Sequence, residues 1–383
     1  MWYTATHIYT PSGWVTDFAI HVDESGMIID MGALPAGEQA VALKGLLVPG
    51  FVNAHCHLEL SGLAGTVSEN TGMAGFVQQL LSARQELSDE EAEKAAGDAM
   101  DIAYESGTVA FGDICNGPLS IKAKRIRPHI FTHSFIELLG MDAEKAGLIL
   151  ENGKTLAGSF GDLVHSLTLH APYSISPPLR DKFAQTDIRL RSFHLYESRE
   201  EVDLFLGKGG GLSRFLQKIP AYNSFAFPPG DPASYLLKNT NLDASMLWVH
   251  LAEIKASRLA GLATHFPKAY ACLCPRANYY IHRSVPDADM FQRIMPERIC
   301  IGTDSLAGNF SLNMLEEVAH LQQHFPHIKL HTLLKWATTN GAAALGIDDQ
   351  YGTFVPGTRP GLVHIPQEDP DRLNLGQIAT LVI

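Results

Sequence analysis

At 383 residues the chain is too long for one small domain and long enough to bury a core, so we expect one large domain with a smaller part attached. Its formal net charge of -12 argues against nucleic acid and anionic membranes as partners, and no apolar run approaches the ~20 residues of a membrane span. Five cysteines, mostly within apolar runs, and an N-terminus without a signal-peptide pattern predict a cytoplasmic protein without a disulfide framework.

The two ends of the sequence alternate apolar and polar side chains as β-strands do. Strand-like runs cover residues 2–5, 14–22, 27–31, 361–365 and 379–383. Strands without helices need another layer to cover their apolar face. We therefore expect residues 1–47 and 348–383 to form one small β-sandwich domain.

Residues 48–347 follow a different pattern, in which strands alternate with helices. A capping box of Ser88 and Glu91 opens a helix that runs to about Glu105, and the clearest helical period covers residues 311–324. Strand-like runs cover residues 108–113, 164–170, 189–194, 246–251, 269–274 and 298–304. This number of alternating units predicts an α/β fold of the (β/α)8 TIM-barrel type rather than an open sheet.

Six polar residues each end an apolar, strand-like run, where catalytic groups of such barrels lie. They are His55, His57, His170, His194, His250 and Asp304. His55 and His57 stand at i and i+2, so both imidazoles point to the same side of one strand and can reach one metal ion. One histidine at a strand end is usually structural, but five with an aspartate are not explained in that way. Such a set suits one divalent metal, zinc first, with iron or manganese as alternatives.

The segment PGFVNAHCHLEL, residues 49–60, resembles the first-strand signature of the amidohydrolase superfamily of metal-dependent hydrolases. Further segments resemble that superfamily in its own order: HAPYSIS from His170, FHLYES from Phe193, VHL from Val249, CPRAN from Cys274 and IGTDS from Ile301. The resemblance covers most of the chain. It is closest to the branch that deaminates aminated heterocycles, including the aminodeoxyfutalosine, adenosylhomocysteine and chlorohydrolase-type enzymes.

The resemblance implies a site and a reaction. The metal ligands would be His55, His57, His194 and Asp304. Metal-bound hydroxide would attack the amine-bearing ring carbon of a small molecule, such as a purine nucleoside derivative, and ammonia would leave. Glu197 would carry a proton to a ring nitrogen and to the leaving group, His250 would contact the hydroxide, and Asp304 would collect the water's proton.

The resemblance also implies substrate contacts and an assembly. The substrate would contact His170, Tyr173, Arg276, Asn278 and Ser305. The resemblance also implies a homodimer. A second metal is not expected, because no lysine ends a strand. The remaining histidines are expected on the surface; they include His265, His282, His320, His324, His327 and His331. Residues 207–231 are expected to be an insertion beside the pocket.

Three alternatives stay open. His250 and Glu253 repeat the HxxE pattern and could replace His194 and Glu197, although in the family a second histidine precedes the CPxxN segment by some twenty-odd residues, and His250 precedes Cys274 by 24. The same metal and barrel could also hydrolyse an amide or release another ring substituent. A non-catalytic binding protein is a third interpretation, but it would have no need of the acid Glu197.

Overall fold

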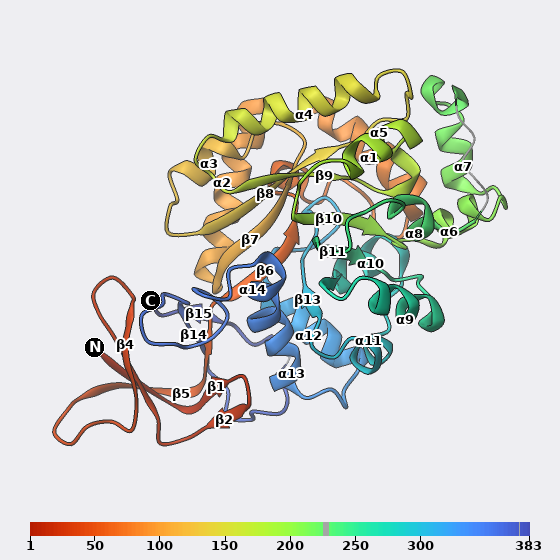
Figure 1. Ribbon diagram of the computed structural model, residues 1–383. Coiled ribbons are helices and arrows are strands. Elements are labelled where there is room, and N and C mark those ends of the chain that lie inside the picture. The colour runs from red at the N-terminus through yellow and green to blue at the C-terminus, as the bar shows by residue number, and fades with distance from the viewer. Residues whose placement is uncertain (225–229, 375) are drawn as a thin grey trace.

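The computed structural model describes residues 1–224, 230–374 and 376–383. It has a larger part, in which helices surround a set of strands, and a small sheet that holds both chain ends (Figure 1). Residues 225–229, within the expected insertion 207–231, lie outside the described residues. Among the described residues, no helix is both long and apolar enough to cross a membrane. All five cysteines are buried as free thiols.

Eight parallel strands form the centre of the larger part, in two sheets of four. The first sheet contains β6 (Phe51–Cys56), β7 (Thr108–Cys115), β8 (Phe131–Leu138) and β9 (His165–Leu169). The second contains β10 (Leu190–Leu195), β11 (Ser245–His250), β12 (Ala269–Leu273) and β13 (Ile299–Ile301). Within each sheet the strands pair in chain order. The carboxyl ends of the four strands in a sheet therefore lie on the same side.

The two sheets also meet along their outer edges. Between β9 and β10, the Thr168 hydroxyl donates to the Ser192 carbonyl and accepts the Ser192 N–H at 2.9 Å. On the other side, the N–H groups of Thr303 and Asp304 donate to the His55 carbonyl at 3.0 and 3.1 Å. These contacts bring the end of β13 beside β6, so residues from the first and last strands can share one site.

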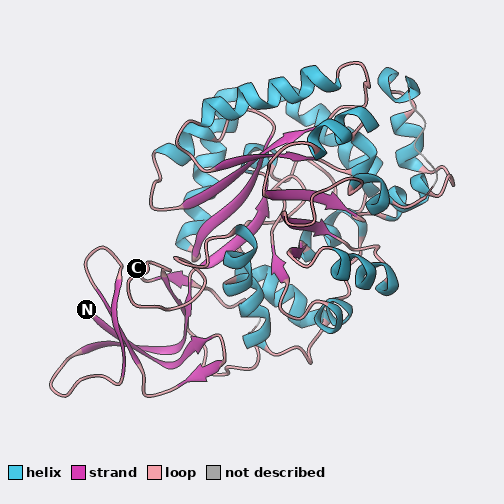
Figure 2. Cartoon of the chain, in the orientation of Figure 1, coloured by secondary structure: helices cyan, strands magenta, loops and turns pink. Residues whose placement is uncertain are grey.

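Helices lie outside the strands (Figure 2). They are α1 (Gly72–Glu86), α2 (Asp89–Glu105), α3 (Ile121–Arg125), α4 (Ala146–Phe160), α5 (Pro177–Ala184), α6 (Arg199–Phe205), α7 (Gly211–Leu216), α8 (Pro232–Leu236), α9 (Ala256–His265), α10 (Pro275–His282), α11 (Ala288–Ile294), α12 (Met314–His324), α13 (Leu330–Ala337) and α14 (Thr339–Leu345). The capping box at Ser88 is confirmed, since both of its hydrogen bonds are formed. Helix α12 begins later than expected because Asn313 caps it, accepting the Leu315 N–H at 2.9 Å.

The terminal segments form one sheet of seven strands. It contains β1 (Trp2–Thr10), β2 (Gly13–Val15), β3 (Ala19–Val22), β4 (Ile28–Gly32), β5 (Ala40–Pro49), β14 (Leu362–Ile365) and β15 (Thr380–Leu381). Strand β14 pairs with β5, so segments from both ends of the sequence lie in this one sheet. Strand β1 pairs antiparallel with β2 and β3, and β3 pairs antiparallel with β4, whereas β1 and β5 pair in parallel.

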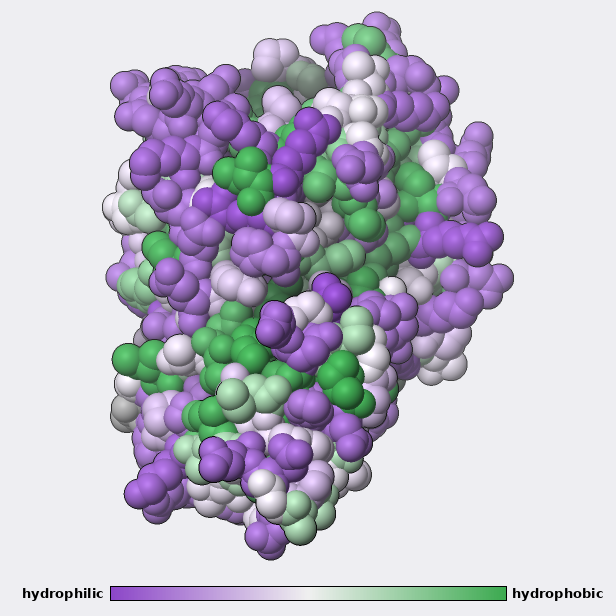
Figure 3. Space-filling view, turned by 90° about the vertical axis from the view of Figure 1, so that its left-hand side faces the viewer, coloured by the Kyte–Doolittle hydropathy of each residue, from purple (hydrophilic) through white to green (hydrophobic). Residues whose placement is uncertain are grey.

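The small sheet connects directly to the larger part. Only Gly50 separates β5 from β6, and a Cβ at this position would lie 2.5 Å from the Val109 side chain and 2.6 Å from the Pro360 carbonyl. Glycine therefore permits the close approach of these segments. Figure 3 shows apolar side chains gathered in patches at the level where the two parts meet.

Candidate metal and catalytic site

Polar side chains gather at the carboxyl ends of the central strands. His55 lies near the end of β6 and His57 just beyond it, while His194 and His250 lie at the ends of β10 and β11. Asp304 follows β13 and is joined to Cys56 by a parallel bridge. Because parallel strands end on the same side, residues far apart in the sequence meet here, as the alternation of strands and helices predicts.

Four of these residues form a tight group. His57 Nε2 lies 3.3 Å from both His194 Nε2 and Asp304 Oδ1, and His55 Nε2 lies 3.8 Å from Asp304 Oδ1. Possible ligand atoms of His55, His57 and Asp304 all lie within 4.8 Å of one another, as do those of His55, His194 and His250.

The chemistry of this group fits a metal ion. Both ring nitrogens of His55 and of His250 are buried without a hydrogen-bond partner among the described residues. Unpartnered buried polar groups are costly, and an ion bound to one ring nitrogen of His55 would remove part of that cost. Imidazole nitrogens and carboxylate oxygens are donors that zinc binds, and a zinc with three nitrogens and one oxygen can still take water as a fifth ligand.

Burial favours the neutral form of three of these histidines, the form in which an imidazole can bind a metal. Burial lowers the pKa of His55, lowers that of His194 well below its ordinary value, and lowers that of His250 to about 3. Burial alone would raise the pKa of Asp304, but contact with His55 and the nearby His57 and His250 lower it instead. The group is therefore a set of lone-pair donors with one carboxylate.

The backbone is strained at the same strand ends. His250 has φ +73°, Leu251 +55° and Asp304 +58°, all in the left-handed region that residues other than glycine rarely adopt. Tyr196, between His194 and Glu197, has φ +50°. Such conformations persist where the surrounding structure holds them, and they are concentrated at functional sites.

Glu197 lies beside the group and is supported through its backbone. Its Oε1 is 3.7 Å from His250 Nε2, and burial raises its pKa well above the ordinary value. Its N–H donates to Glu201 Oε2 at 3.0 Å, and its carbonyl accepts the Asn278 side-chain N–H at 3.5 Å. The alternative acid, Glu253, is half-buried and belongs to none of the ligand groups formed by the described residues. The geometry thus favours the pair His194 and Glu197.

The residues expected to contact the substrate divide into two sets. The His170 ring lies 4.8 Å from the His194 ring and 5.8 Å from the ring of buried Tyr173. Asn278 and Ser305 are also buried, the latter directly after Asp304. These four residues lie close to the metal group or to Glu197.

Arg276 differs from the other expected contacts. Its Nη1 pairs with Glu316 Oε2 at 2.5 Å and donates to Ser311 Oγ at 2.9 Å, and the guanidinium lies over the Phe310 ring. These contacts hold the guanidinium against Glu316, Ser311 and Phe310. Arg276 stands two residues before Asn278, but side chains at this spacing point to different faces of a helix. Arg276 therefore lies away from the site although Asn278 lies beside it.

The Arg276 backbone leads to a prediction about pH. Its N–H donates at 3.0 Å to Glu317, whose carboxyl group is fully buried and has its pKa raised by burial to about 7. The folded chain then keeps a proton that the unfolded chain has lost, so this contribution to stability is present below pH 4.5 and is lost as the pH rises through 7. We expect the free energy of unfolding in urea to fall by on the order of 3 kcal/mol from this group over that range.

Comparison with Glu317→Gln isolates the effect. The amide does not titrate, so the variant should show a shallower fall in unfolding free energy between about pH 5 and about pH 8, whatever its absolute stability. Equal slopes in the two proteins would contradict the raised pKa of Glu317.

Two residues near the site were not expected there. Glu137, in β8, has its Oε1 3.5 Å from His194 Nδ1. His282 was expected on the surface, and that was wrong: its Nε2 is buried without a partner among the described residues, and burial lowers its pKa to about 4. It also lies near enough to Asp304 for that carboxylate to raise its pKa in part.

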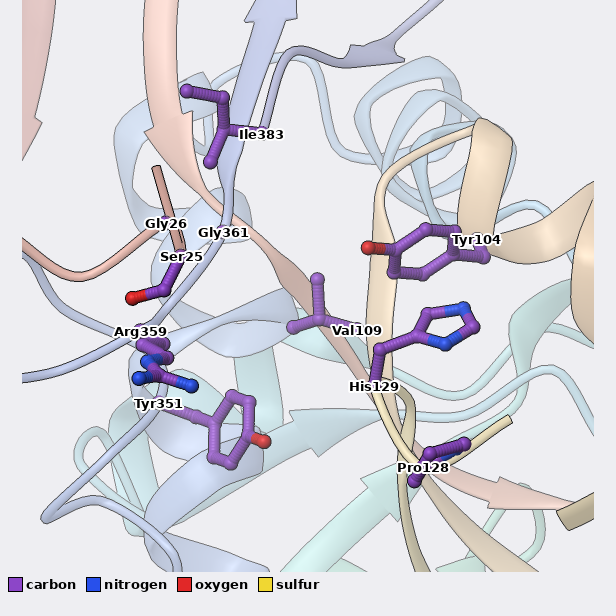
Figure 4. A pocket seen from close by; sticks show the side chains of 10 residues that line it. All are labelled: Ser25, Gly26, Tyr104, Val109, Pro128, His129, Tyr351, Arg359, Gly361 and Ile383. Atoms are coloured by element: carbon purple, nitrogen blue, oxygen red, sulfur yellow. The ribbon is translucent and has the colours of Figure 1, made fainter. Parts of the chain in front are cut away.

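Two hollows lie at opposite ends of the strands. An apolar groove of about 440 Å³ adjoins the site, since Asn116 lines it and also donates to Glu137 Oε2 at 2.9 Å. A second pocket of about 210 Å³ has Arg359 and Tyr351 on one side and Tyr104 and His129 on the other (Figure 4). It also includes Val109 at the start of β7, so it lies at the amino ends of the strands, away from the metal group.

Known proteins resemble the chain in sequence and fold. A 5-methylthioadenosine/S-adenosylhomocysteine deaminase of Teredinibacter turnerae is 24% identical over 370 residues, covering 87% of this chain and 74% of that protein. Helicobacter pylori aminofutalosine deaminase, crystallised with methylthio-coformycin, superposes with a TM-score of 0.79 at 22% identity, covering 94% of this chain and 91% of that one. Arthrobacter aurescens atrazine chlorohydrolase complexed with zinc superposes with a TM-score of 0.73 at 16% identity, covering 94% and 86%. The sequence pattern of the amidohydrolase family matches residues 46–382, and the chain belongs to that family.

Proposed function

We propose that the chain catalyses the hydrolytic deamination of an aminated heterocycle, a purine nucleoside derivative or a related base, with release of ammonia. The observation that carries this proposal is a buried carboxyl group, Glu197, with a raised pKa beside a group of histidines and one aspartate. The names of the relatives, which include a methylthioadenosine/S-adenosylhomocysteine deaminase, support the same class of substrate.

One divalent metal, zinc first, would be held by His55, His57, His194 and Asp304. When bound there, it would lower the pKa of a water molecule and so supply a nucleophile near neutral pH. The zinc of the related chlorohydrolase structure supports this choice of metal. The donor set of three imidazoles and one carboxylate leaves room for water and substrate.

The chain's own residues would move the protons. Glu197, whose pKa burial raises well above its ordinary value, would protonate the ring nitrogen and later the leaving ammonia. Neutral His250 would hydrogen-bond the attacking oxygen, and Asp304 would accept the proton of the water. His170, Tyr173, Asn278 and Ser305 would contact the substrate; Arg276 is omitted because its guanidinium is paired with Glu316.

The proposal includes the architecture that holds the site. The two four-stranded sheets would close into one (β/α)8 barrel over residues 48–347, supported by the hydrogen bonds between β9 and β10 and between β6 and the end of β13. Residues 1–47 and 348–383 would form the small β-sandwich domain. We also propose a cytoplasmic homodimer, as the family resemblance implies.

Ammonia release from a panel of aminated purines and pyrimidines tests the reaction. The decisive comparison uses an accepted substrate and its analogue with CH in place of the adjacent ring nitrogen, which keeps the shape but removes the proton acceptor. We expect the analogue to bind competitively without turnover, because Glu197 has no nitrogen to protonate. Comparable turnover of the analogue would contradict deamination by this route and favour hydrolysis of an amide or another ring substituent.

A further inference from the structure

Glu137 and His194 present two unsatisfied atoms to each other. Glu137 Oε1 and His194 Nδ1 lie 3.5 Å apart, both are buried, and neither has a hydrogen-bond partner among the described residues. The other nitrogen of the same ring, Nε2, lies 3.3 Å from His57 Nε2. One edge of the His194 ring therefore faces the metal group, and the other edge faces Glu137.

The carboxylate of Glu137 is fixed from its far side. Its Oε2 accepts the Asn116 side-chain N–H at 2.9 Å. The Asn116 backbone N–H in turn donates to Glu59 Oε2 at 3.0 Å, and the same oxygen accepts the Gly117 N–H at 3.0 Å. These hydrogen bonds hold the loop after β7 and orient Glu137 at the end of β8, so Oε1 is directed to His194 without a competing donor.

From this arrangement we infer that Glu137 is a positioning residue for the metal. A neutral imidazole that offers its Nε2 lone pair to a metal carries its proton on Nδ1, and an acceptor at Nδ1 fixes both the tautomer and the orientation of the ring. Glu137 Oε1 is that acceptor for His194. A carboxylate there also makes the ligand nitrogen more basic. The inference rests on the proposed metal ligands and adds a residue that does not touch the metal.

A second cation is the competing interpretation, because possible ligand atoms of Glu137, His170 and His194 lie within 4.8 Å of one another. His194 would then need a second lone pair, on Nδ1, and its ring would have to lose both protons. One proton on His194 Nδ1, shared with Glu137, is the simpler state.

The experiment measures zinc affinity by competition with a chelator, and zinc content at saturation, in the full chain. We expect Glu137→Ala to bind zinc about 10- to 100-fold more weakly while still holding one zinc per chain when saturated. Glu137→Gln should lose less, because its amide oxygen can still accept from Nδ1. Glu253→Ala removes another carboxylate outside the ligand groups and should bind zinc as the parent does.

Cobalt(II) bound in place of zinc has a visible absorption spectrum that depends on the metal's ligands. A purely structural role of Glu137 would leave that spectrum unchanged. The visible absorption of the bound cobalt should shift in Glu137→Ala and return toward the parent spectrum in Glu137→Gln. An unchanged zinc affinity in Glu137→Ala, or two zinc ions in the parent and one in the variant, would overturn the inference alone. A parent chain that binds no zinc would overturn the proposed metal site as well.

Discussion

Replacing His194 with alanine is expected to remove the metal and, with it, activity. The parent should hold close to one divalent metal per chain, measured by elemental analysis after purification. His194 Nε2 lies 3.3 Å from His57 Nε2. Without His194, only three of the four proposed ligands remain. His55→Ala should have the same effect, since His55 lies at the end of β6 between the other rings.

A surface histidine provides the matched control. His265, at the end of α9, is exposed and belongs to none of the ligand groups formed by the described residues. His265→Ala should therefore keep the metal content of the parent. Full metal retention in both His55→Ala and His194→Ala would reject the site, whatever the activity of the two variants.

The second expected result separates catalysis from binding. Glu197→Gln keeps the size of the side chain but cannot donate and accept a proton, so kcat should fall at least ~10²-fold, as is typical for general acid and base groups. The metal should remain, because Glu197 is not among its proposed ligands. Metal content and kcat measured on the same preparation distinguish this loss from a loss of the site.

Glu253→Gln is the control for this experiment. Glu253 stands in the same HxxE spacing after His250, but its half-buried carboxylate lies outside the ligand groups of the described residues. Its substitution should leave kcat close to that of the parent. An active Glu197→Gln together with an inactive Glu253→Gln would show that the acid is Glu253.

The strands and ligands that could be predicted from the sequence are those with strong local patterns. The run that ends at His250 is apolar from Met246 to Val249, which marks both the strand and its end. The run that ends at His194 contains Arg191 and Ser192, so that strand end was found through the resemblance of its FHLYES segment to the superfamily. The capping box at Ser88 is equally local. Such local elements can be assigned without knowledge of tertiary contacts, whereas the ligand set rests on the resemblance to the superfamily.

The missed features depend on contacts between distant segments. Strand β8 contains buried polar residues, which are stable there because distant segments provide their hydrogen-bond partners. Ser134 Oγ accepts a hydrogen bond from the Lys124 ammonium at 2.7 Å, and His133 contacts Ser166 Oγ at 2.9 Å. The apolar signal is therefore weak, and Glu137 could not be placed at a strand end. His282 was missed for a related reason, since it ends a helix and reaches the site only through the packing of α10.

The pairing of β5 has a consequence for synthesis on the ribosome. β5 lies between β1 and β14, and the second of these partners is made only after all eight central strands. Until then, the edge formed by Leu46, Leu47 and Val48 has unpaired backbone groups and apolar side chains, the combination that promotes aggregation of nascent chains. Chains truncated before residue 362 would lack β14, so this edge of β5 would stay unpaired. The yield of soluble protein from such truncated chains would then depend on chaperones that cover the edge.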